Sequence, residues 1–526
     1  GLSGFPKRSE SPCDAYDAGH SSNSISAGLG YVHARDILGQ KHHVVSVIGD
    51  GALTGGMAYE ALNNAAELKT NFIIIINDNN MSISRNVGGM STYLSALRTA
   101  EAYTGMKMGV TKALKKVPKV GTALLDTMRK TKSSVKQLFI PGMLFENMGL
   151  TYLGPVDGHN MRQMMKLFNE AKRVEGPVIV HVLTQKGRGY EPASLHPDQF
   201  HGTGPFDIRT GRQLTVKKGP SWTDVFSDVM VRLGKDNPKL VGITAAMKAG
   251  TGLVAFEKAF PERLFDVGIA EEHAVSFAAG LALGGMIPVV AIYSSFLQRA
   301  VDQMLHDVCM QNLHVVFCVD RAGLVGSDGE THHGVFDVSY LSSVPDMTVL
   351  CPASYAELET MLRAAIYDIN GSVAIRYPRG GEGKYTACNT APETLLRDGR
   401  DVTLVCYGIM TNEVLDAAER LAAEGISAEV IKLSMIKPPD FDLVMRSLRK
   451  TGKLLISEDV CEAGCVGSRI LEEAAISEID IRAAKLLNLG EGIVPHGTVA
   501  ELLHDFGLDA DGIVSAAMEM MDKDMK

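Results

Sequence analysis

Two apolar segments, each followed at once by polar residues, limit what this chain can fold into more than any other feature. The first, His43–Ile48, runs into the residues Gly49-Asp50-Gly51-Ala52. The second, Asn71–Ile76, runs into Asn77-Asp78-Asn79-Asn80-Met81, and a helix is predicted between the two over 55–68. A strand, a helix and a strand within about thirty residues predict a parallel βαβ unit.

The carboxyl ends of parallel strands share one edge of a sheet, where ligands collect in open α/β folds. Asp50 and Asn79 are therefore expected at the same edge. A carboxylate, an amide oxygen and a backbone carbonyl are hard oxygen ligands that suit Mg²⁺, with diphosphate oxygens and water completing an octahedron. Gly49 and Gly51 permit a tight turn and the close approach of a phosphate. Taken alone, these residues also fit a strand-to-helix turn that Asp50 merely caps.

The turn at Gly49–Gly51 does not match the two commonest nucleotide-binding motifs. It has no lysine of the kind that a P-loop requires, and its glycine spacing does not follow GxGxxG. A GDG turn followed by an asparagine-rich strand end is instead the motif of enzymes that bind thiamine diphosphate. The pairing therefore predicts thiamine diphosphate and Mg²⁺ as cofactors.

Strands and helices alternate along the rest of the chain, and 526 residues are too many for one core. A polar linker is predicted near 210–220. Further strands are predicted at 177–183, 240–244, 289–293, 315–320, 402–407, 427–432 and 453–458. The pattern predicts an α/β protein of three doubly wound domains, at 1–207, 221–385 and 396–526.

Composition and apolar runs exclude several other classes of protein. The net charge of −9 argues against nucleic-acid binding as the main activity. The run Phe277–Tyr293 is the nearest candidate for a membrane span, but glycines and Pro288 interrupt it, so a buried helix followed by a buried strand is predicted instead. The lysine-rich segment between Thr99 and Val135 is expected to be a solvated helical face.

The chain opens with Gly1 and shows no initiator methionine, signal peptide or targeting pattern, so a native start is expected upstream. Its eight cysteines include no CxxC pair, and several stand in apolar runs, as in proteins whose thiols stay reduced. These features favour a cytoplasmic location. A plastid location stays open, because a targeting segment could precede Gly1.

Charged residues follow predicted strands of the second domain. Thiamine diphosphate chemistry needs an acid beside the aminopyrimidine ring, and Glu271 is the candidate. Arg321 and Arg379 follow two further strands, and arginine forks bind phosphate oxygens with two hydrogen bonds. Helix capping, surface charge or a structural role is the alternative for each residue. Imidazole titrates near neutrality, so the histidines that could move protons are His20, His201 and His332.

A series of segments, in order along the chain, resembles the 1-deoxy-D-xylulose-5-phosphate synthase family. They are GLSGFPKRSESP, AGHSSNSISAGLG, VIGDGALTGGMAYEALN, INDNNMSIS, GPVDGHN, QKGRGYEPA, DVGIAEEHAVSFAAGLA, YSSFLQRAVDQ, DRAGLVGSDGETHHG and IRYPRG. The segments DRAGLVGSDG and ETHHG are shared in part with transketolases, whereas AGHSS, NDNNMSIS and GRGYEPA favour the synthase family.

The resemblance implies a thiamine-diphosphate-binding, transketolase-like fold. In that fold residues 1–207, incomplete at their N-terminus, bind the diphosphate and the metal. Residues 221–385 bind the pyrimidine ring, and residues 396–526 form a transketolase-like C-terminal domain. The resemblance also implies a homodimer, with no nucleic-acid or membrane partner.

The resemblance implies a role for each matching residue. The expected ligands of Mg²⁺ are Asp50, Asn79 and the carbonyl of Met81. The residues expected to line the cofactor are Gly19, His20, Ser21, Gly51, Ala52, Asn79 and Tyr190, with Glu271 activating the aminopyrimidine and Phe296 stacking on it. The substrate phosphate is expected to meet Tyr293, Arg321 and Arg379. The residues expected at the reacting carbons are His201, Asp328 and His332.

The implied reaction joins pyruvate to D-glyceraldehyde 3-phosphate with loss of CO₂. Its product, 1-deoxy-D-xylulose 5-phosphate, enters the methylerythritol phosphate route to isoprenoids and feeds thiamine and pyridoxal synthesis. The alternatives are ketol transfer of the transketolase type, which releases no CO₂, and an inactive fragment. Family members carry a further upstream segment with a histidine near the diphosphate, so that histidine has no counterpart here. Glu272 stands where family members often have glutamine, a change expected to be tolerated.

Overall fold

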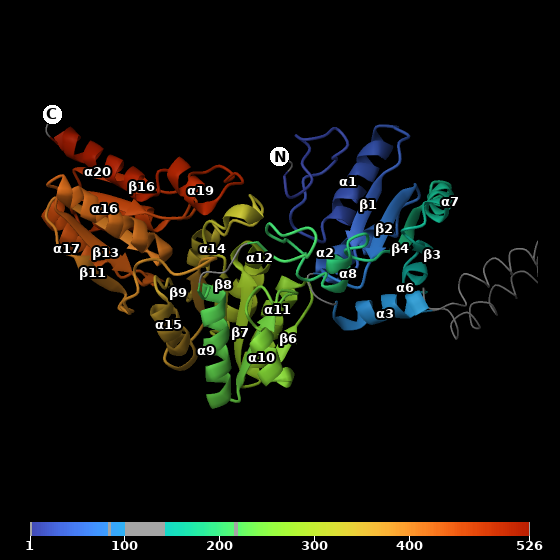
Figure 1. Cartoon of the computed structure of the whole chain (residues 1–526), viewed down its shortest axis with the longest axis horizontal. Helices are drawn as coiled ribbons and strands as arrows, with labels where there is room; N and C mark the ends of the chain where they lie inside the picture. Colours follow the sequence, from blue (N-terminus) through green and yellow to red (C-terminus); the bar gives the residue numbers. More distant parts are fainter. Residues whose placement is uncertain (1–2, 83–85, 100–142, 215–218, 525–526) are drawn as a thin grey trace, which may run out of the picture. The chain divides into compact units, whose positions relative to one another are not determined.

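The computed structural model describes residues 3–82, 86–99, 143–214 and 219–524. The chain divides into two compact units (Figure 1). We call them the first unit, His20–Thr215 with Gly268–Ala270, and the second unit, Gly1–Gly19, Val216–Val267 and Glu271–Lys526. The lysine-rich segment predicted to be a helical face lies, beyond Thr99, outside the described residues.

A four-stranded parallel sheet with the strand order β1-β2-β4-β3 forms the centre of the first unit. Its strands are β1 (Val45–Gly49), β2 (Phe72–Asp78), β3 (Thr151–Asp157) and β4 (Pro177–Leu183). Its helices are α1 (Ser24–Ile37), η1 (Ala52–Thr54), α2 (Gly56–Ala65), α3 (Gly88–Thr99), α6 (Met143–Asn147), α7 (Met161–Ala171) and α8 (Glu191–Leu195).

Helices pack on both faces of the inner strands of this sheet, which explains why these strands are almost continuously apolar, whereas Val45 and Val47 of the edge strand β1 are exposed on one face. On one face, Ile25 of α1 and Leu62 of α2 belong to the same buried cluster as Phe72 of β2. On the other face, Ala171 of α7 is buried with Val178 of β4. At the carboxyl edge of the sheet, Gly49, the last residue of β1, pairs with Asn77, the penultimate residue of β2.

A seven-stranded sheet with the order β14-β9-β10-β8-β7-β5-β6 lies in the second unit. Its strands are β5 (Leu240–Thr244), β6 (Leu264–Asp266), β7 (Ile287–Tyr293), β8 (Val316–Asp320), β9 (Thr348–Leu350), β10 (Val373–Tyr377) and β14 (Met435–Lys437). All pair in parallel except β14, which is antiparallel to β9. We call it the middle sheet.

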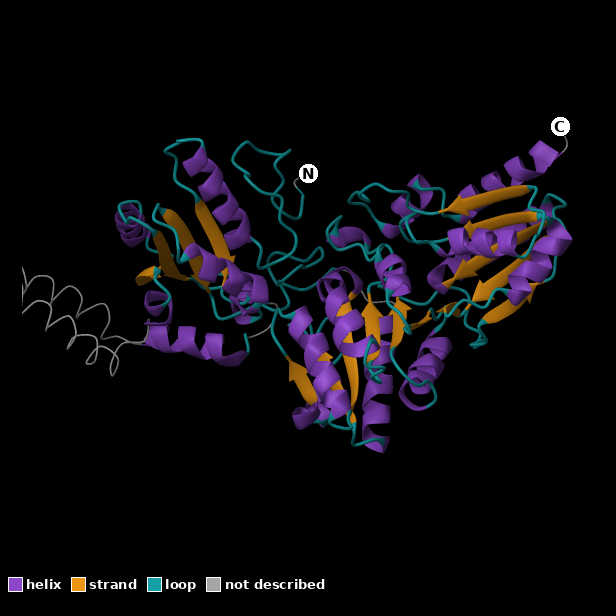
Figure 2. Cartoon of the chain, turned by 180° about the vertical axis from the view of Figure 1, so that it is seen from behind, coloured by secondary structure: helices purple, strands orange, loops and turns teal. Residues whose placement is uncertain are grey.

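The helices around the middle sheet alternate with its strands along the chain. Figure 2 shows helices in purple and strands in orange. The helices around this sheet are α9 (Trp222–Asp236), α10 (Val254–Ala259), η2 (Pro261–Arg263), α11 (Glu271–Leu283), α12 (Ser294–Leu297), η3 (Gln298–Ala300), α13 (Val301–Gln303), η4 (Met304–Cys309), η5 (Gly326–Asp328), α14 (Asp337–Ser343) and α15 (Tyr355–Tyr367). A capping box at Ser221 and Asp224 begins α9, whose buried face carries Trp222 and Phe226.

A five-stranded sheet, order β11-β13-β12-β15-β16, also belongs to the second unit. Its strands are β11 (Glu393–Arg397), β12 (Val402–Tyr407), β13 (Ala428–Leu433), β15 (Lys453–Ser457) and β16 (Ala483–Leu487), with β11 antiparallel. Its helices are η6 (Gly408–Met410), α16 (Thr411–Ala423), α17 (Asp442–Thr451), α18 (Val466–Ile476), α19 (Val499–Asp505) and α20 (Ala510–Asp524). We call this sheet with its helices the C-terminal domain.

The predicted fold class is confirmed by these three α/β sheets, whereas the predicted domain boundaries stay predictions. The strands expected at 177–183, 240–244 and 402–407 have those bounds in β4, β5 and β12. The apolar run Phe277–Tyr293 forms the end of α11 followed by β7, which confirms the predicted helix and buried strand. The helical part is only partly buried, since Leu283 is 65% exposed. Several strands were not predicted, namely β3, β9, β11, β14 and β16. Of these, β14 leaves the C-terminal part of the chain and extends the middle sheet.

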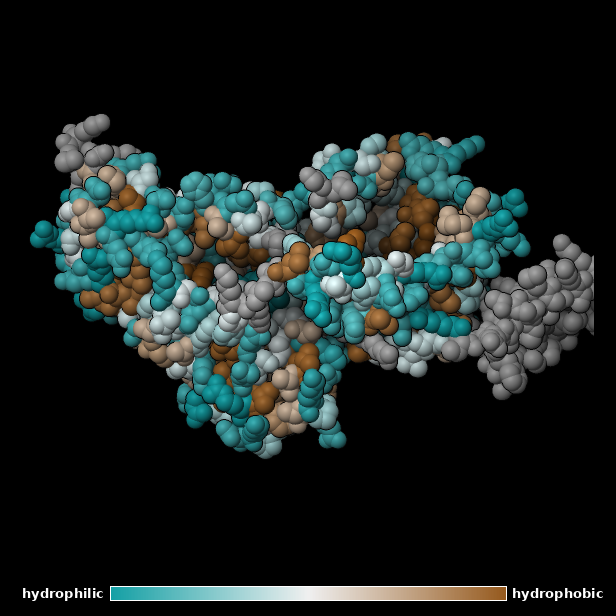
Figure 3. Space-filling model, in the orientation of Figure 1, coloured by the Kyte–Doolittle hydropathy of each residue, from teal (hydrophilic) through white to brown (hydrophobic). Residues whose placement is uncertain are grey.

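Figure 3 shows hydrophilic residues over most of the visible surface, with apolar residues in smaller groups. Within the described ranges, no helix is long and apolar enough to cross a membrane. All eight cysteines are free thiols, as expected, and six of them are buried.

Candidate active site

Asp50 directly follows β1 at the carboxyl edge of the first sheet and is buried. Its Oδ2 accepts a hydrogen bond of 2.8 Å from the side-chain amide of Asn86. Its Oδ1 is buried as well and accepts no hydrogen bond from the residues that the structure describes. Burial raises the pKa of this carboxyl. The backbone amides of Asn79 and Asn80 and the charge of Arg98 lower it, but by less. An open, buried carboxylate oxygen is suited to a cation.

The turn after β2 presents amide and carbonyl oxygens next to the end of β1. The Oδ1 of Asn79 accepts the backbone N–H of Met81 at 3.0 Å, and Asp78 accepts the N–H of Asn80 at 3.2 Å. Asn80 has a φ of 64°, a left-handed conformation that asparagine tolerates better than most residues. An amide oxygen has two lone pairs, so Asn79 keeps one for a cation.

A network of side chains supports this turn and was not predicted from the sequence. It joins the buried residues Asp78, His181 and Tyr152 to the partly exposed Arg98. The carboxylate of Asp78 accepts hydrogen bonds from Nε of Arg98 at 2.8 Å and from Nε2 of His181 at 2.9 Å. Since Nε2 donates, Nδ1 of His181 accepts the hydroxyl of Tyr152, which lies 2.6 Å away. Burial, and then the charge of Arg98, lower the pKa of His181 to about 4, so the ring is neutral. A histidine inside the apolar strand β4 was the available signal.

The residues expected around the diphosphate lie on loops that meet at Ala52. The hydroxyl of Ser22 donates a hydrogen bond of 2.7 Å to the carbonyl of Ala52, and His20 and Ser21 immediately precede it. A Cβ on Gly51 would lie 2.8 Å from the Cβ of Ser82, which follows β2. The close approach of these two loops therefore requires glycine at position 51.

Tyr190 and His201 belong to the region that follows β4. The ring of Tyr190 packs against Phe200 and Phe206, with centroid distances of 5.6 and 5.8 Å. Its hydroxyl is buried and lacks a hydrogen-bond partner in the described part of the chain. Nδ1 of His201 lies 3.0 Å from the ammonium of Lys186. Partial desolvation of the ring, and then that ammonium, lower the pKa of His201, which keeps it neutral and able to accept a proton.

Glu271 begins α11 in the second unit and is 2% exposed. Its Oε2 lies 3.6 Å from Nη1 of Arg299 and accepts no hydrogen bond from any described residue. Burial raises the pKa of Glu271, and the charge of Arg299 opposes that shift. Arg299 was not predicted as a site residue, although it is the only cation in the segment YSSFLQRAVDQ.

An aromatic cluster gathers several other predicted residues of the second unit. Phe296 stacks on Tyr293 with centroids 5.7 Å apart and meets His332 edge-on at 5.2 Å. The His332 ring also stacks on Phe5, with centroids 5.3 Å apart. The guanidinium of Arg321 lies 3.9 Å from the centre of the Tyr293 ring, a cation–π contact. Burial raises the pKa of Tyr293 to about 12, so its hydroxyl keeps its proton.

Both predicted arginines are oriented by acids and by backbone carbonyls. Arg379 forms an ion pair of 2.8 Å with Asp328 and donates to the carbonyl of Val325 at 3.2 Å. Arg321 pairs with Asp320 at 3.0 Å and donates to a backbone carbonyl at 3.0 Å. Fixed guanidinium planes are the arrangement that binds phosphate oxygens with two hydrogen bonds.

The predicted residues are divided between the two units. Those in the first unit are His20, Ser21, Asp50, Gly51, Ala52, Asn79, Met81, Tyr190 and His201. Those in the second unit are Gly19, Glu271, Tyr293, Phe296, Arg321, Asp328, His332 and Arg379. Gly19 packs against Thr331, next to His332, because a Cβ on it would lie 2.4 Å from that side chain.

The donors of the first unit fit a divalent cation that shares its coordination with a diphosphate. Among the described residues, no group of three or more His, Cys, Asp or Glu side chains could hold a metal by itself. One open carboxylate oxygen, one amide oxygen and a carbonyl suit Mg²⁺, which usually takes few protein ligands and completes its shell with phosphates and water. In the second unit, the open oxygen of Glu271 fits a hydrogen bond to a heterocyclic nitrogen.

Family comparisons match nearly the whole chain. Residues 1–184 match the family described as "1-deoxy-D-xylulose-5-phosphate synthase". Residues 218–381 match "Transketolase, pyrimidine binding domain", and residues 393–513 match "Transketolase, C-terminal domain".

Proteins similar to this chain are named after the same synthase family. A 1-deoxy-D-xylulose-5-phosphate synthase of Heliobacterium modesticaldum is 47% identical over 530 aligned positions, which cover 100% of this chain and 82% of that protein. One of Lachnoclostridium phytofermentans is 49% identical, covering 98% of this chain and 83% of that protein. A solved structure titled "Split gene transketolase, inactive beta4 tetramer" is 32% identical with a TM-score of 0.52, covering 58% of this chain and 99% of that one.

The match to the synthase family and to the two transketolase domains agrees with the α/β sheets. It also agrees with the presence of one buried acid with an open oxygen in each unit, Asp50 in the first and Glu271 in the second. It settles the fold as the transketolase-like, thiamine-diphosphate-binding one, and the class of enzyme as a transferase. The chain therefore belongs to the 1-deoxy-D-xylulose-5-phosphate synthase family.

Proposed function

We propose that this chain joins pyruvate to D-glyceraldehyde 3-phosphate, with release of CO₂, to form 1-deoxy-D-xylulose 5-phosphate. The observation that carries this proposal is the pair of buried acids with an open oxygen, Asp50 in the first unit and Glu271 in the second. The reaction needs one acid for a metal and another for the aminopyrimidine ring. When bound, thiamine diphosphate supplies a nucleophilic carbon and a ring that accepts the electron pair left by CO₂.

Asp50, Asn79 and the carbonyl of Met81 would hold Mg²⁺ on the diphosphate. The open Oδ1 of Asp50 and the second lone pair of the Asn79 amide supply two of the ligands. Gly51 would let the backbone approach the phosphates, and His20, Ser21, Ala52 and Tyr190 would line the same side. The network of Asp78, Arg98 and His181 would hold the turn after β2 in place, with the charge of Arg98 balancing that of Asp78 beside a neutral His181.

Glu271 would hold a proton between its Oε2 and the aminopyrimidine ring. Its raised pKa favours this, because a carboxyl that gives and takes a proton near neutral pH needs a pKa closer to that pH. Arg299, 3.6 Å away, limits the shift and so keeps the ionised form accessible. Phe296 would stack on the ring.

Tyr293, Arg321 and Arg379 would bind the phosphate of D-glyceraldehyde 3-phosphate. The two guanidiniums are already oriented by Asp320 and Asp328, so little rotamer freedom remains to be lost on binding. The residues proposed to handle protons at the reacting carbons are His201, Asp328 and His332. The neutral state of His201 suits a proton acceptor.

We also propose that the chain acts as a homodimer in the cytoplasm, as its family resemblance suggests. Sedimentation equilibrium of the purified full-length protein at micromolar concentration tests the first part. A single species of one chain's mass would contradict it.

Donor choice tests the proposed reaction. The full-length protein, with Mg²⁺ and thiamine diphosphate, is given D-glyceraldehyde 3-phosphate and pyruvate labelled with ¹³C at C1 and C2. The expected result is one labelled CO₂ for each 1-deoxy-D-xylulose 5-phosphate, read by ¹³C NMR. Turnover with a ketose phosphate donor, and none with pyruvate, would instead show ketol transfer of the transketolase type. No turnover with either donor would mean an inactive protein.

A further inference from the structure

The C-terminal domain packs against a loop that carries two of the proposed substrate residues. This loop, residues 323–334, is closed at its neck by two backbone hydrogen bonds of 2.9 and 2.8 Å between Gly323 and Gly334. Asp328 and His332 lie on it. We call it the closed loop. Its backbone is therefore fixed at the neck, and its placement depends on what surrounds it.

A buried set of three charges lies at the neck of the closed loop. Arg376 on β10 contacts Asp337 at 3.1 Å and Asp459 at 3.4 Å. All three side chains are buried. Asp337 begins α14 shortly after the neck, whereas Asp459 belongs to the C-terminal domain, just after β15. One guanidinium thus joins the segment that leaves the loop to the C-terminal domain.

The segment after β15 also contacts both backbone segments that meet at the neck, near Gly323 and near Gly334. A Cβ on Gly323 would lie 1.7 Å from Oδ2 of Asp459, so the carboxylate fills the space beside the Gly323 backbone. Two residues further on, the backbone N–H of Cys461 donates a hydrogen bond of 2.9 Å to the carbonyl of Val335. The C-terminal domain therefore sets the position of the neck from two sides.

His333 links the C-terminal domain to the residue that orients Arg379. Its buried Nδ1 accepts the backbone N–H of Val325 at 3.2 Å, so Nε2 carries the hydrogen and donates to the carbonyl of Pro495 at 3.2 Å. The carbonyl of the same Val325 accepts the guanidinium of Arg379. A single peptide unit of the closed loop thus lies between a contact of the C-terminal domain and a proposed phosphate ligand.

Apolar packing reinforces these polar contacts. Leu324, at the start of the closed loop, and Val335, directly after its end, share one buried cluster with side chains of the C-terminal domain. Those side chains are Met410, Leu489, Val494, Leu502 and Leu508. Apolar packing therefore joins the neck of the closed loop to the C-terminal domain.

We infer that contacts with the C-terminal domain position the closed loop for the phosphate-bearing substrate. The positioning residues are Asp459 of the C-terminal domain and His333 of the loop. This rests on the proposed function, because it assumes that Arg321 and Arg379 bind the phosphate. Neither Asp459 nor His333 needs to touch substrate. They fix the backbone from which Asp328 and Arg379 receive their orientation.

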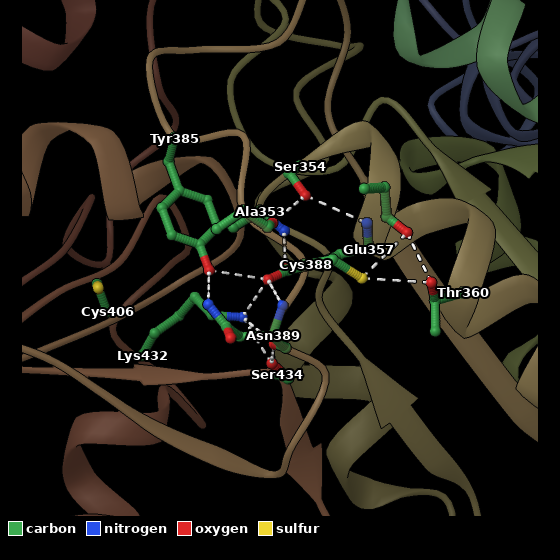
Figure 4. Close-up of polar contacts among 12 residues, drawn as sticks. Ala353, Ser354, Glu357, Thr360, Tyr385, Cys388, Asn389, Cys406, Lys432 and Ser434 are labelled. Atoms are coloured by element: carbon green, nitrogen blue, oxygen red, sulfur yellow. Dashed lines mark hydrogen bonds and ion pairs between the residues drawn. The ribbon is translucent and has the colours of Figure 1, made fainter.

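A second buried contact between the same two sheets offers a matched control. Lys432 on β13 contacts Glu357 on α15 at 2.8 Å, and both side chains are fully buried (Figure 4). The Lys432 ammonium also donates to the carbonyl of Asn389 at 2.8 Å and to the hydroxyl of Ser434 at 2.6 Å. These residues lie on α15, β13 and the connection between the sheets, and none of them is part of the closed loop.

The test compares Asp459→Asn with Lys432→Met in the full-length protein. Asp459→Asn keeps the shape of the side chain and removes the charge that faces Arg376. We expect its KM for D-glyceraldehyde 3-phosphate to rise about ten- to a hundredfold, as for a small misplacement of binding groups, with the KM for pyruvate little changed. Lys432→Met should lower the urea midpoint while leaving both KM values near those of the parent. An equal rise of both KM values in Asp459→Asn, or no rise, would overturn the inference.

Substitutions at His333 give an independent test that does not remove a charge. His333→Gln can still accept from Val325 and donate to Pro495, whereas His333→Leu can do neither. We expect His333→Leu to raise the KM for the aldehyde substrate selectively and His333→Gln to restore most of it. Identical KM values in the two variants would show that the ring only fills space.

The parent protein separates this inference from the proposed function. If the parent does not turn over pyruvate with D-glyceraldehyde 3-phosphate, the proposed function fails. If the parent does so but Asp459→Asn and Lys432→Met behave alike, the positioning role fails and the proposed function stands.

Discussion

The buried acids of the candidate active site differ from those where the middle sheet meets the C-terminal domain. Asp50 and Glu271 each keep one buried oxygen that accepts no hydrogen bond from the described residues. The oxygens of Glu357, by contrast, all have partners. Its donors are the backbone N–H groups of Ala353 and Asn389, the Tyr385 hydroxyl and the Lys432 ammonium.

Burial of a charge costs several kcal/mol unless other groups compensate it, so a protein normally completes such shells itself. A shell left open points to a partner that the chain does not supply. Asp320 is intermediate: its Oδ1 accepts no hydrogen bond but lies 3.0 Å from the Arg321 guanidinium. The comparison predicts that changes at open shells affect ligands, whereas changes at closed shells affect stability.

The largest expected effect is at Asp50. Asp50→Ala removes the open oxygen. The sheet should stay intact, because Asp50 lies in the turn after β1 and is not part of the apolar cluster of the first unit. Isothermal titration of the full-length variant with thiamine diphosphate and Mg²⁺ should show little or no heat. Asp337→Asn, a change in a closed shell, is the control and should bind the cofactor like the parent. Unchanged affinity in Asp50→Ala would remove the metal assignment.

Glu271→Gln should separate cofactor binding from cofactor activation. The amide keeps a hydrogen-bonding side chain but cannot hold an exchangeable acidic proton, so binding should survive. Deprotonation at C2 of bound thiamine diphosphate should slow about 10²–10⁴-fold, the range for a positioned acid–base group. Hydrogen–deuterium exchange at C2, read by NMR after acid quench, measures it. Exchange as fast as in the parent would point to neighbouring Glu272 instead.

Lys432→Met tests the prediction that a change at a buried acid with a complete set of partners affects stability and not ligand binding. It leaves the Glu357 carboxylate buried without its cation, which costs about 3–5 kcal/mol, and the urea midpoint should fall accordingly. The double variant Lys432→Met/Glu357→Leu removes the stranded charge and should recover part of the loss. Cofactor affinity should stay unchanged in both. A single variant as stable as the parent would mean that the pair contributes nothing.

His181 tests a closed shell that lies directly beneath an open one. Its pKa of about 4 in the folded chain is below the ordinary value of 6.5, so the unfolded chain binds more protons between these values. The contribution of His181 to the free energy of unfolding should therefore be fully present above about pH 6.5. It should be lost as the pH falls towards 4, by up to about 3 kcal/mol. His181→Gln should flatten this dependence of the urea midpoint. NMR titration of the ring should find it neutral at pH 5.5, and a protonated ring there would contradict the shift.

The smallest expected effect concerns the phosphate. Arg321→Ala and Arg379→Ala should each raise the KM for D-glyceraldehyde 3-phosphate about ten- to a hundredfold, because losing a charged hydrogen bond costs about 1.5–3 kcal/mol. The KM for pyruvate, which carries no phosphate, should change much less. Steady-state kinetics with each substrate varied in turn measures both. An equal effect on the two substrates would make these arginines structural.

The sequence by itself determined most of the long central strands and the motifs at their ends. Strands covered on both faces read as apolar runs, and turn residues end them, so β4, β5 and β12 have the predicted bounds. Asp50 and Asn79 were expected at one sheet edge for the same reason, since parallel neighbours end together. These signals are local, because they depend only on which residues follow one another.

Only the tertiary structure decided which charges are paired and which are open. His181 meets Asp78 across 103 positions of sequence, and Arg376 meets Asp459 across 83. The crossing of β14 into the middle sheet likewise depends on a partner strand far along the chain. Nothing near these residues in the sequence indicates their partners. Compensation of a buried charge is set by the register of sheets and the packing of loops, which the whole fold determines.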